Sequence, residues 1–346
     1  MFYSKGTDMS QNKYGLDIGS SNFKMCFRDQ VLNEKNMIAV TRKEVVGIGD
    51  DAYDMYEKVP ENIDVSFPVK GGVIADIYNM QILLSKFWQK INGTKRSMGV
   101  SDFFIAVPRN VTDVEKRAFY ELVVRSGIKV RNILEVDKPV ADAVGAGIDV
   151  QNAKGIMIVD IGAETCEMSV LSLGGIVESK SVKIGGNRLD EDIIYAVRNE
   201  YNLVIGNKTA ERLKIGLACA GSNFNSISMT GFGRNVLTGL PTSCQISDEV
   251  INSAIKEPLA GIVEEVRIFL ENTPPEFAVD IIKNGIFLTG GTSGIRNMDE
   301  LFRRNLNVSV KVVNTPQESI IRGLMRIMAD SRMSSLAYVP DDRLFE

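Results

Sequence analysis

Residues 14–22 read YGLDIGSSN, and residues 156–165 read IMIVDIGAET. Each stretch is an apolar run that enters a turn at Asp-Ile-Gly, and each is followed by a second strand-like run, at residues 23–27 and 166–173. This pattern predicts two β-hairpins with tight turns. One Asp-x-Gly alone would carry little information, but the matched pair predicts two related halves that face each other.

Around the hairpins, strand and helix patterns alternate, which predicts an α/β fold. A helix is expected over residues 112–126, where Thr112 and Glu115 have the spacing of a capping box. A long helix is expected from residue 247 to about residue 272, ended by Pro274 and Pro275. The other expected elements are helices at 77–91, 138–145, 189–201, 208–216 and 316–329, strands at 102–107, 130–136, 175–182 and 285–289, and a β-rich segment at 226–238.

The composition limits the possible classes of protein. A chain of 346 residues with 44% hydrophobic content can bury a large core and is expected to form two domains or more. The formal net charge of −4 argues against nucleic acid as a partner. No apolar run reaches the length of about 18 residues that a membrane-spanning helix needs, and residues 1–12 lack the apolar core of a secretory signal.

The chemistry available to the chain is narrowed by its cysteines and histidines. The four cysteines are far apart and form no C-x-x-C pair, so we expect reduced thiols rather than disulfides or a zinc site. The chain contains no histidine, which excludes Ser-His-Asp and Cys-His catalysis and H-E-x-x-H zinc sites. Chemistry must therefore depend on carboxylates, lysines, hydroxyls, backbone amides or a bound metal.

The sequences of the two hairpin turns are suited to binding phosphate. Residues 17–22 can present backbone N–H groups and hydroxyls to phosphate oxygens, because Gly19 allows a close approach. Residues 160–162 can do the same. Asp17 and Asp160, at the ends of their strands, suit a Mg²⁺ ion held largely through water molecules.

A third loop, residues 288–293 (LTGGTS), is suited to a nucleoside, because a strand there opens into two glycines whose backbone can lie flat against a ring. Each loop by itself could be an ordinary glycine turn, but the three in this order predict a nucleotide site. Neither a Walker A motif nor G-x-G-x-x-G occurs, so P-loop and Rossmann folds are not supported.

This order of loops resembles the superfamily of actin, sugar kinases and heat-shock chaperone ATPases, and most closely the MreB family of bacterial actins. The resemblance runs from about residue 13 to residue 328, and it depends on many short collinear matches. These are residues 68–76 (PVKGGVIAD), 107–108, 114–118, 143–147 (AVGAG), 184–190, 209–214, 257–263 and 274–276.

The resemblance implies an actin-like fold, with two related lobes, each a mixed sheet with flanking helices, and four subdomains around a nucleotide cleft. The expected boundaries are 1–35, 68–146 and 316–346 for the core of lobe I (IA), 36–67 for its small subdomain (IB), 147–183 and 245–315 for the core of lobe II (IIA), and 184–244 for its small subdomain (IIB).

The resemblance also implies ATP or ADP with Mg²⁺ in that cleft. The residues expected at the phosphates are Asp17, Gly19, Ser20, Ser21, Asn22, Asp160, Gly162, Ala163, Glu164 and Thr165. The residues expected at the adenosine are Glu211, Arg212, Leu213, Lys214, Gly290, Gly291, Thr292 and Ser293.

Two departures from the family bear on hydrolysis. Where the family has Glu-Glu-Pro, with its second Glu orienting the attacking water, this chain has Asp137-Lys138-Pro139. A charged lysine cannot accept a hydrogen bond from water, so we expect slow ATP hydrolysis. In the alternative, Asp137 serves as that carboxylate and Lys138 is merely solvated.

The second departure lies in the second phosphate loop, where Gly-Gly-Gly-Thr of the family is replaced by residues 162–165 (GAET). Glu164 brings a carboxylate toward phosphate, and like charges repel. We hypothesise that the two changes compensate, either because Lys138 pairs with Glu164 or because Lys138 offsets the charge of phosphate and Glu164 together. Asp137, Lys138, Glu164 and Thr165 are therefore the residues expected to govern catalysis.

The implied function is a cytoplasmic filament, beneath the cell membrane, that controls cell shape, with the chain itself and other MreB paralogues as partners. The altered catalytic position resembles divergent copies from wall-less, helical swimming bacteria such as Spiroplasma, which implies a role in helicity and motility. Residues 1–11 show no basic amphipathic pattern, and ordinary solvated termini are favoured over membrane contact. Residues 91–100, with Lys95 and Arg96, are a weak candidate for a surface contact. The rivals are a small-molecule kinase, with Glu164 as its base, and a plasmid-segregation actin.

Overall fold

The computed structural model describes residues 12–42, 44–93, 99–221 and 226–340. The chain forms two compact units, Met1–Ala141 with Ile320–Glu346, and Asp142–Ser319. Residues 1–11, the first stretch considered for membrane contact, and residues 94–98, the middle of the second, lie outside the described residues. No helix in the described ranges combines the length and the apolarity needed to cross a membrane.

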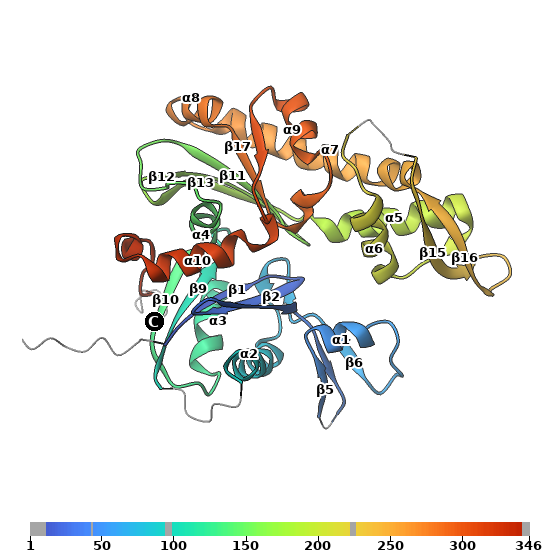
Figure 1. The fold of residues 1–346 in the computed structure, drawn as a ribbon, viewed down its shortest axis with the longest axis horizontal. Coiled ribbons are helices and arrows are strands. Elements are labelled where there is room, and N and C mark those ends of the chain that lie inside the picture. The colour runs from blue at the N-terminus through green and yellow to red at the C-terminus, as the bar shows by residue number, and fades with distance from the viewer. Residues whose placement is uncertain (1–11, 43, 94–98, 222–225, 341–346) are drawn as a thin grey trace, which may run out of the picture. The chain divides into compact units, whose positions relative to one another are not determined.

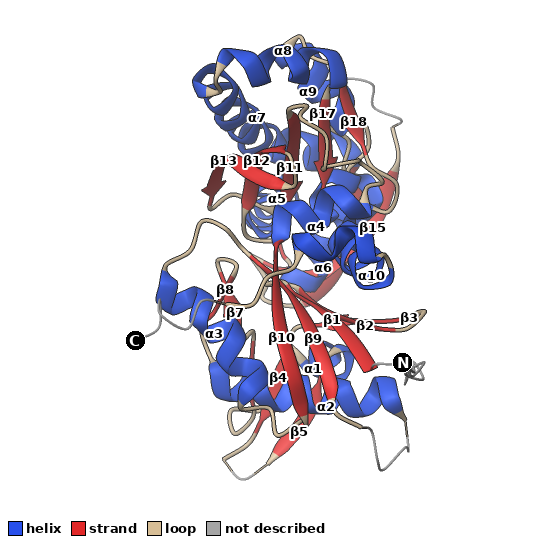
Figure 2. Ribbon diagram, turned by 90° about the vertical axis from the view of Figure 1, so that its left-hand side faces the viewer, coloured by secondary structure: helices blue, strands red, loops and turns tan. Residues whose placement is uncertain are grey.

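The first unit is built on a five-stranded sheet of order β10-β9-β1-β2-β3 (Figure 1). Its strands are β1 (Asn12–Ile18), β2 (Asn22–Phe27), β3 (Gln30–Lys35), β9 (Ser101–Val107) and β10 (Val130–Asp137). Strand β1 runs antiparallel to β2 and parallel to β9. Helices α2 (Ile77–Asn92) and α3 (Asp113–Val124) lie on one face of the sheet, and α10 (Ser319–Ala329) lies on the other (Figures 1 and 2).

Smaller elements complete the first unit. They are the three-stranded sheet β5-β4-β6, made of β4 (Ile38–Val40), β5 (Val45–Ile48) and β6 (Asp64–Ser66), the helix α1 (Asp50–Met55), the hairpin β7 (Val69–Lys70) and β8 (Val73–Ile74), and the 3₁₀ turn η3 (Ser331–Leu336). A separate apolar cluster of Met37, Ala39 and Ala52 holds the small sheet to α1.

The second unit repeats the plan of the first. Its main sheet has the order β13-β12-β11-β17-β18, and its central strand β11 again runs antiparallel to the next strand in sequence and parallel to a distant one. The strands are β11 (Ile156–Ile161), β12 (Cys166–Ser172), β13 (Gly175–Val182), β17 (Ile286–Thr289) and β18 (Val310–Val312). The prediction of two related halves is thereby confirmed.

The helices and the small sheet of the second unit follow the same chain order. The helices are α4 (Lys138–Gly145, shared with the first unit), α5 (Gly186–Tyr201), α6 (Asn207–Leu217), α7 (Asp248–Asn272), α8 (Pro275–Asn284) and α9 (Met298–Leu306), with the 3₁₀ turns η1 (Gly291–Gly294) and η2 (Pro316–Glu318). The small sheet has the order β14-β15-β16, made of β14 (Leu203–Val204), β15 (Ser228–Asn235) and β16 (Pro241–Ser247).

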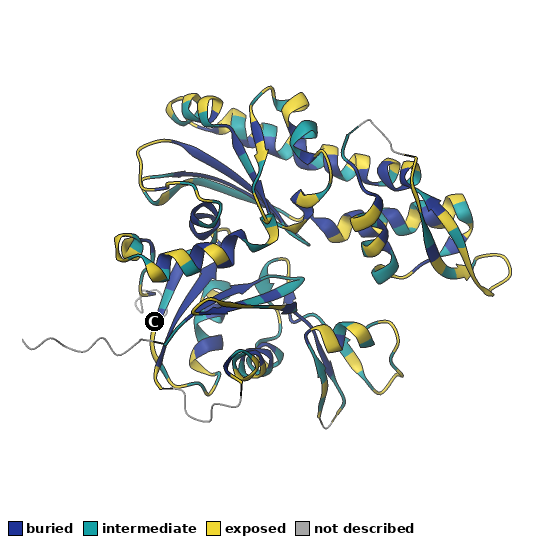
Figure 3. Ribbon diagram, viewed as in Figure 1, coloured by how far each residue is buried: buried dark blue, intermediate teal, exposed yellow. Residues whose placement is uncertain are grey.

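Each unit has its own hydrophobic core, and the central strands β1 and β11 are dark with burial in Figure 3. In the first unit Tyr14 stacks on Phe27 at 4.5 Å and on Phe103 at 5.2 Å between ring centroids. The Tyr14 hydroxyl donates to Asn92 Oδ1 at 2.8 Å, which satisfies the one polar atom of that ring. These contacts hold β1 between β2 and β9 and thereby fix the position of its carboxyl end.

The strongest patterns in the sequence correspond to observed elements. Helix α3 has Thr112 as its N-cap, and both hydrogen bonds of the capping box with Glu115 are present. Helix α7 ends at Asn272, as the following prolines predict. The sequence analysis missed α8, which begins at Pro275 because proline is tolerated in the first helical turn, where its missing N–H has no helical partner to lose.

Replacing the N-cap in Thr112→Ala is expected to lower the free energy of unfolding by about 1 kcal/mol, because the N–H of Glu115 loses its acceptor. Urea denaturation measures the change. Val114→Ala is the matched control, since Val114 is 80% exposed in the same helix and is expected to change stability by less than about 0.5 kcal/mol. Equal effects of the two substitutions would contradict the assigned cap.

Candidate functional site

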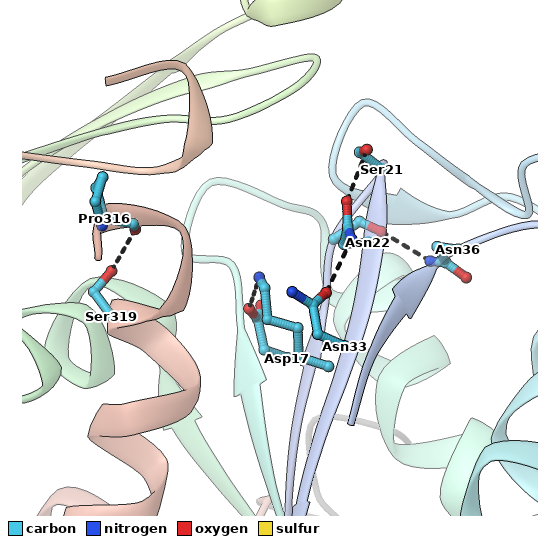
Figure 4. A network of polar contacts seen from close by, with 9 residues as sticks. Asp17, Ser21, Asn22, Asn33, Asn36, Pro316 and Ser319 are labelled. Carbon is cyan, nitrogen blue, oxygen red and sulfur yellow. Dashed lines mark hydrogen bonds and ion pairs between the residues drawn. The ribbon is translucent and has the colours of Figure 1, made fainter. Parts of the chain in front are cut away.

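The first turn joins β1 to β2 and is closed by its own backbone. The N–H of Gly19 donates to the carbonyl of Asn22 at 3.0 Å, and Asn36 Nδ2 donates to the carbonyl of Gly19 at 2.8 Å. Ser21 Oγ donates to Asn22 Oδ1 at 3.0 Å, and Asn22 Nδ2 donates to Asn33 Oδ1 at 2.9 Å (Figure 4). The predicted phosphate residues of this turn are therefore held in one hydrogen-bonded network.

Ser20 is held separately, because its Oγ accepts from the N–H of Gly72 at 3.2 Å. Residue 72 belongs to the stretch 68–76 that carries the family resemblance, and it lies in the turn between β7 and β8. A segment about fifty residues away in sequence thus fixes a hydroxyl of the first turn.

Asp17 lies at the end of β1 and is almost fully buried, at 2% exposed. Its cross-strand partner is Lys24 on β2, whose Nζ lies 2.7 Å from Asp17 Oδ2. Both side chains are shielded from solvent, with exposures of 11% for Lys24 and 3% for Asp17. The two strands of the first hairpin are therefore joined by an ion pair, which the sequence analysis did not anticipate.

The second turn, between β11 and β12, is closed in the same way. The N–H of Gly162 donates to the carbonyl of Thr165 at 2.8 Å, and the carbonyls of Gly162 and Ala163 accept from the N–H groups of Gly186 and Asn187 at 3.0 Å and 2.7 Å. The beginning of α5 is thus bonded directly to this turn.

Asp160 occupies in the second hairpin the place that Asp17 has in the first, but its cross-strand partner is Glu167. Both carboxylates are buried, at 9% and 8% exposed, and Thr165 Oγ1 donates to Glu167 Oε1 at 3.4 Å. The pKa of the neighbouring Cys166 thiol is raised well above its usual value by burial and by the charges of Asp160 and Glu167. The Cys166 thiol therefore stays protonated at neutral pH.

The glycine loop at the end of β17 lies against Asp160. A Cβ on Gly290 would be 2.2 Å from Asp160 Oδ1, and φ of Gly290 is +79°, so only glycine fits there without strain. The N–H of Gly290 donates to the carbonyl of Pro316 at 2.9 Å. The hydroxyl of Ser319 donates to the same carbonyl at 3.0 Å (Figure 4). Thr289 Oγ1 donates to Asp142 Oδ2 at 2.5 Å and fixes the strand end.

Two of the residues predicted to bind adenosine make hydrogen bonds near the start of α5. Thr292 Oγ1 donates to the carbonyl of Gly162 at 2.8 Å, and Lys214 Nζ donates to the carbonyl of Gly186 at 2.8 Å and to Asp190 Oδ2 at 2.6 Å. The structure thereby brings Lys214 of α6 and the glycine loop to the second turn.

The other residues predicted to bind adenosine make contacts elsewhere in the second unit. Leu213 is fully buried in the core of the second unit, and Arg212 Nη2 donates to the carbonyl of Thr230 on β15 at 2.6 Å. Glu211 lies on the same helix, Gly291 opens η1, and Ser293 Oγ donates to the carbonyl of Thr289 at 2.5 Å. A role in binding adenosine stays a prediction for this set.

Asp137 ends β10 and Lys138 begins α4. Tyr338 donates its hydroxyl proton to Asp137 Oδ1 at 3.2 Å, and Lys116 Nζ donates to the Tyr338 oxygen at 3.0 Å. Lys116 Nζ also lies 3.1 Å from the buried Glu135 carboxylate, whose pKa is raised by burial despite that charge. The sequence analysis missed this cluster, because its members are up to 222 residues apart.

The donors expected for Mg²⁺ are of the right chemical kind. Asp17 and Asp160 are buried carboxylates at equivalent strand ends, and such groups suit a Mg²⁺ ion that keeps most of its water molecules. In the described part of the chain no group of three or more metal-binding side chains is arranged around one point. Asp17 already has an ammonium on one oxygen, and a role for either aspartate in holding Mg²⁺ stays a prediction.

Two halves of one topology, each with a glycine-closed turn after its first strand, define an actin-like protein. A family model described as MreB/Mbl protein matches residues 11–335, and the chain belongs to this family. It is 38% identical over 325 residues to the cell shape-determining protein MreB of Escherichia coli K12, covering 91% of this chain and 92% of that protein. It is 33% identical over 313 residues to the cell shape-determining protein Mbl of Bacillus subtilis, with coverages of 89% and 93%.

Solved structures agree with this assignment. MreB5 of Spiroplasma citri bound to ADP superimposes with a TM-score of 0.86 at 32% identity, covering 92% of this chain and 97% of that one. The same protein bound to AMPPNP gives 0.87 at 31% identity, with coverages of 94% and 98%. A MamK double helical filament gives 0.75 at 21% identity, covering 92% and 99%, and supports the fold alone. The predicted actin-like fold is confirmed.

Replacing Gly290→Ala is expected to cost about 1–3 kcal/mol of stability, because the new Cβ would meet Asp160 in a backbone conformation that favours glycine. Urea denaturation measures the loss. Gly294→Ala is the matched control at the other end of η1, where an added Cβ has no atom within 4 Å. A Gly290→Ala protein as stable as the control would contradict the close approach of this loop to Asp160.

Proposed function

We propose that this protein is an ATP-binding bacterial actin that polymerises into cytoplasmic filaments and helps to determine cell shape. The observation that carries the proposal is the pair of equivalent glycine-closed turns in a chain of the MreB/Mbl family. Its support from relatives is that MreB5 of Spiroplasma citri binds ADP and AMPPNP, and that MreB of Escherichia coli is a cell shape-determining protein.

In this proposal the two turns bind the phosphates, with Ser20 to Asn22 from the first and Gly162 to Thr165 from the second. The glycine loop and Lys214 hold the adenosine, and the hydrogen bonds that tie them to the second turn support this role. Mg²⁺, when bound, neutralises part of the phosphate charge. Asp160 and Asp17 are the residues that would hold its water ligands.

Hydrolysis is proposed to be slow because Lys138 stands where relatives have the glutamate that orients water. The alternative, in which Asp137 takes over that task, is disfavoured by the structure of the first unit. One oxygen of Asp137 already accepts a hydrogen bond from Tyr338 at 3.2 Å, and Tyr338 is in turn bonded to Lys116. Asp137 is thus engaged in the packing of the chain's C-terminal segment.

Replacing Lys138→Glu is expected to raise the rate of phosphate release from ATP by about tenfold or more, because a carboxylate can accept a hydrogen bond from the attacking water. A phosphate-release assay under filament-forming conditions measures the rate. Lys283→Glu, which makes the same change of charge on the exposed side of α8, is the control. A Lys138→Glu rate no different from that of Lys283→Glu would refute the role given to this position.

Exposed apolar side chains favour self-association, and the tip of the hairpin β15–β16 carries two of them. Leu237 and Leu240 are 81% and 65% exposed. Asn235 Oδ1 accepts from the N–H groups of Leu237 and Thr238, both at 2.9 Å, so the tip is a defined structure that presents these leucines outward. We assign this tip to a contact with a second copy of the chain.

The double substitution Leu237→Asp with Leu240→Asp is expected to raise the protein concentration needed for pelleting by about fivefold or more, because it puts charge into an apolar contact. Sedimentation with ATP across a concentration series measures this threshold. Val114→Asp, on the exposed face of α3, is the control. If the double variant pellets at the same protein concentration as the wild type, the tip does not take part in the assembly contact.

The kinase alternative is separated from a filament-forming function by experiment. Pelleting with ATP, with filaments visible by electron microscopy, supports the cytoskeletal function, whereas transfer of phosphate to a metabolite supports a kinase. We also propose a role in cell helicity and swimming, supported by the likeness to MreB5 of Spiroplasma citri and by Lys138. Loss of helical shape on deletion of the gene in a wall-less host would support that role, and an unaltered shape would contradict it.

A further inference from the structure

We propose that Arg296 is a positioning residue for the nucleoside of the bound nucleotide, because it joins the end of α6 to the segment that follows the glycine loop. The inference rests on the proposed ATP-binding function and deepens it. The sequence analysis ended the predicted nucleoside residues of the glycine loop at Ser293. All the residues concerned belong to the second unit, Asp142–Ser319, so their spacing is set within that unit alone.

The two segments predicted to hold the nucleoside approach each other at the start of α5. Lys214 Nζ of α6 donates to the carbonyl of Gly186 at 2.8 Å, and a Cβ added to Gly186 would lie 3.2 Å from that nitrogen. The same added Cβ would lie 2.7 Å from Thr292 Oγ1 of the glycine loop. Helix α6 and the glycine loop therefore converge on one residue, although they are far apart in the sequence.

Arg296 joins the same two segments at a second place. Its Nη2 donates to the carbonyl of Leu217, the last residue of α6, at 2.7 Å, and its Nε donates to the carbonyl of Ala218 at 3.2 Å. Carbonyls at the end of a helix have no partner within the helix and form the negative end of its dipole, so a guanidinium is favoured there. Because the guanidinium is planar, its two donors fix direction as well as distance.

The backbone of Arg296 adds to this connection. Cys219 and Arg296 form an isolated parallel bridge, and the N–H of Ala220 donates to the carbonyl of Arg296 at 2.8 Å. The same segment is also held by α7, because Oδ1 of the buried Asn252 accepts from the N–H of Cys219 at 2.7 Å. The end of α6 is thus tied both to the segment after the glycine loop and to the core of the second unit.

Arg296 acts on the nucleoside through the residues that precede the joint. Ser293 lies three residues before Arg296, and Lys214 lies three residues before Leu217, so each predicted nucleoside segment is within about one helical turn of the connection. Without the guanidinium, α6 and the glycine loop remain connected at Gly186 but lose the side-chain connection at their other end. Contacts to the base and the sugar are therefore expected to weaken more than contacts to the phosphates.

The test uses ethenoadenosine triphosphate, a fluorescent ATP analogue, with Mg²⁺, and measures its dissociation constant and the quenching of the bound base by acrylamide. In Arg296→Met, which has no donor for the helix end, the dissociation constant is expected to rise by about tenfold and the quenching constant by about twofold. Arg296→Lys keeps a cation with donors at the helix end. It is expected to bring the dissociation constant to within about threefold of the wild type and to restore the quenching.

Two further variants make the result specific. Arg303→Met makes the same change on α9, where Arg303 pairs with Asp299 at 2.6 Å on the helix surface, and it is expected to leave both values unchanged. Arg296→Gln keeps an amide donor, and its effect is expected to have the direction of Arg296→Met but a smaller size. Thermal unfolding verifies that each variant is folded, and Arg296→Gln takes the place of Arg296→Met if the latter does not fold.

The possible failures are distinguishable. A wild-type protein that does not bind the analogue would overturn the proposed ATP-binding function itself. A wild type that binds, with a folded Arg296→Met protein whose dissociation constant equals that of Arg303→Met, would overturn the role of Arg296 alone. A raised dissociation constant with unchanged quenching would also overturn that role, because the lost contacts would then lie away from the base.

Discussion

The structure depends on one local constraint, a turn closed by a glycine N–H directly after a buried parallel strand. In the first unit this bond joins Gly19 to Asn22 at 3.0 Å, and in the second it joins Gly162 to Thr165 at 2.8 Å. Each bond returns the chain as an antiparallel strand while the first strand pairs in parallel with β9 or β17. A hydrogen-bonded turn is thereby presented at the carboxyl end of each central strand, where the candidate phosphate residues lie.

The two hairpins have the same backbone arrangement but differ in the charge of the side chain opposite the aspartate. The cross-strand partner of the aspartate is Lys24 in one hairpin and Glu167 in the other, so equivalent positions of the two hairpins carry side chains of opposite charge. The second turn is bonded to segments far from it in sequence, because the N–H groups of Gly186 and Asn187 and the hydroxyl of Thr292 donate to its carbonyls.

The sequence predicts much of the fold, because local signals are strong at its most regular elements. Short local patterns of two to four residues predict the hairpins, the capping box of α3 and the end of α7. Helix α8 was not predicted, because the prolines at its start were interpreted only as the end of α7. The turns of the site were predictable for the same reason. The pairing of Asp17 with Lys24 needed the strand register, and the cluster of Lys116, Glu135 and Tyr338 needed tertiary contacts between distant segments.

We propose that this chain forms an ATP-bound polymer whose hydrolysis is limited by Lys138. The most direct measurement follows phosphate release and sedimentation together, with ATP and Mg²⁺, over a range of protein concentration. The account predicts a threshold concentration above which the protein pellets, with far less than one phosphate released per pelleted subunit during assembly. Brisk phosphate release coupled to assembly would contradict the part given to Lys138, and failure both to pellet and to bind ATP would contradict the proposed function as a whole.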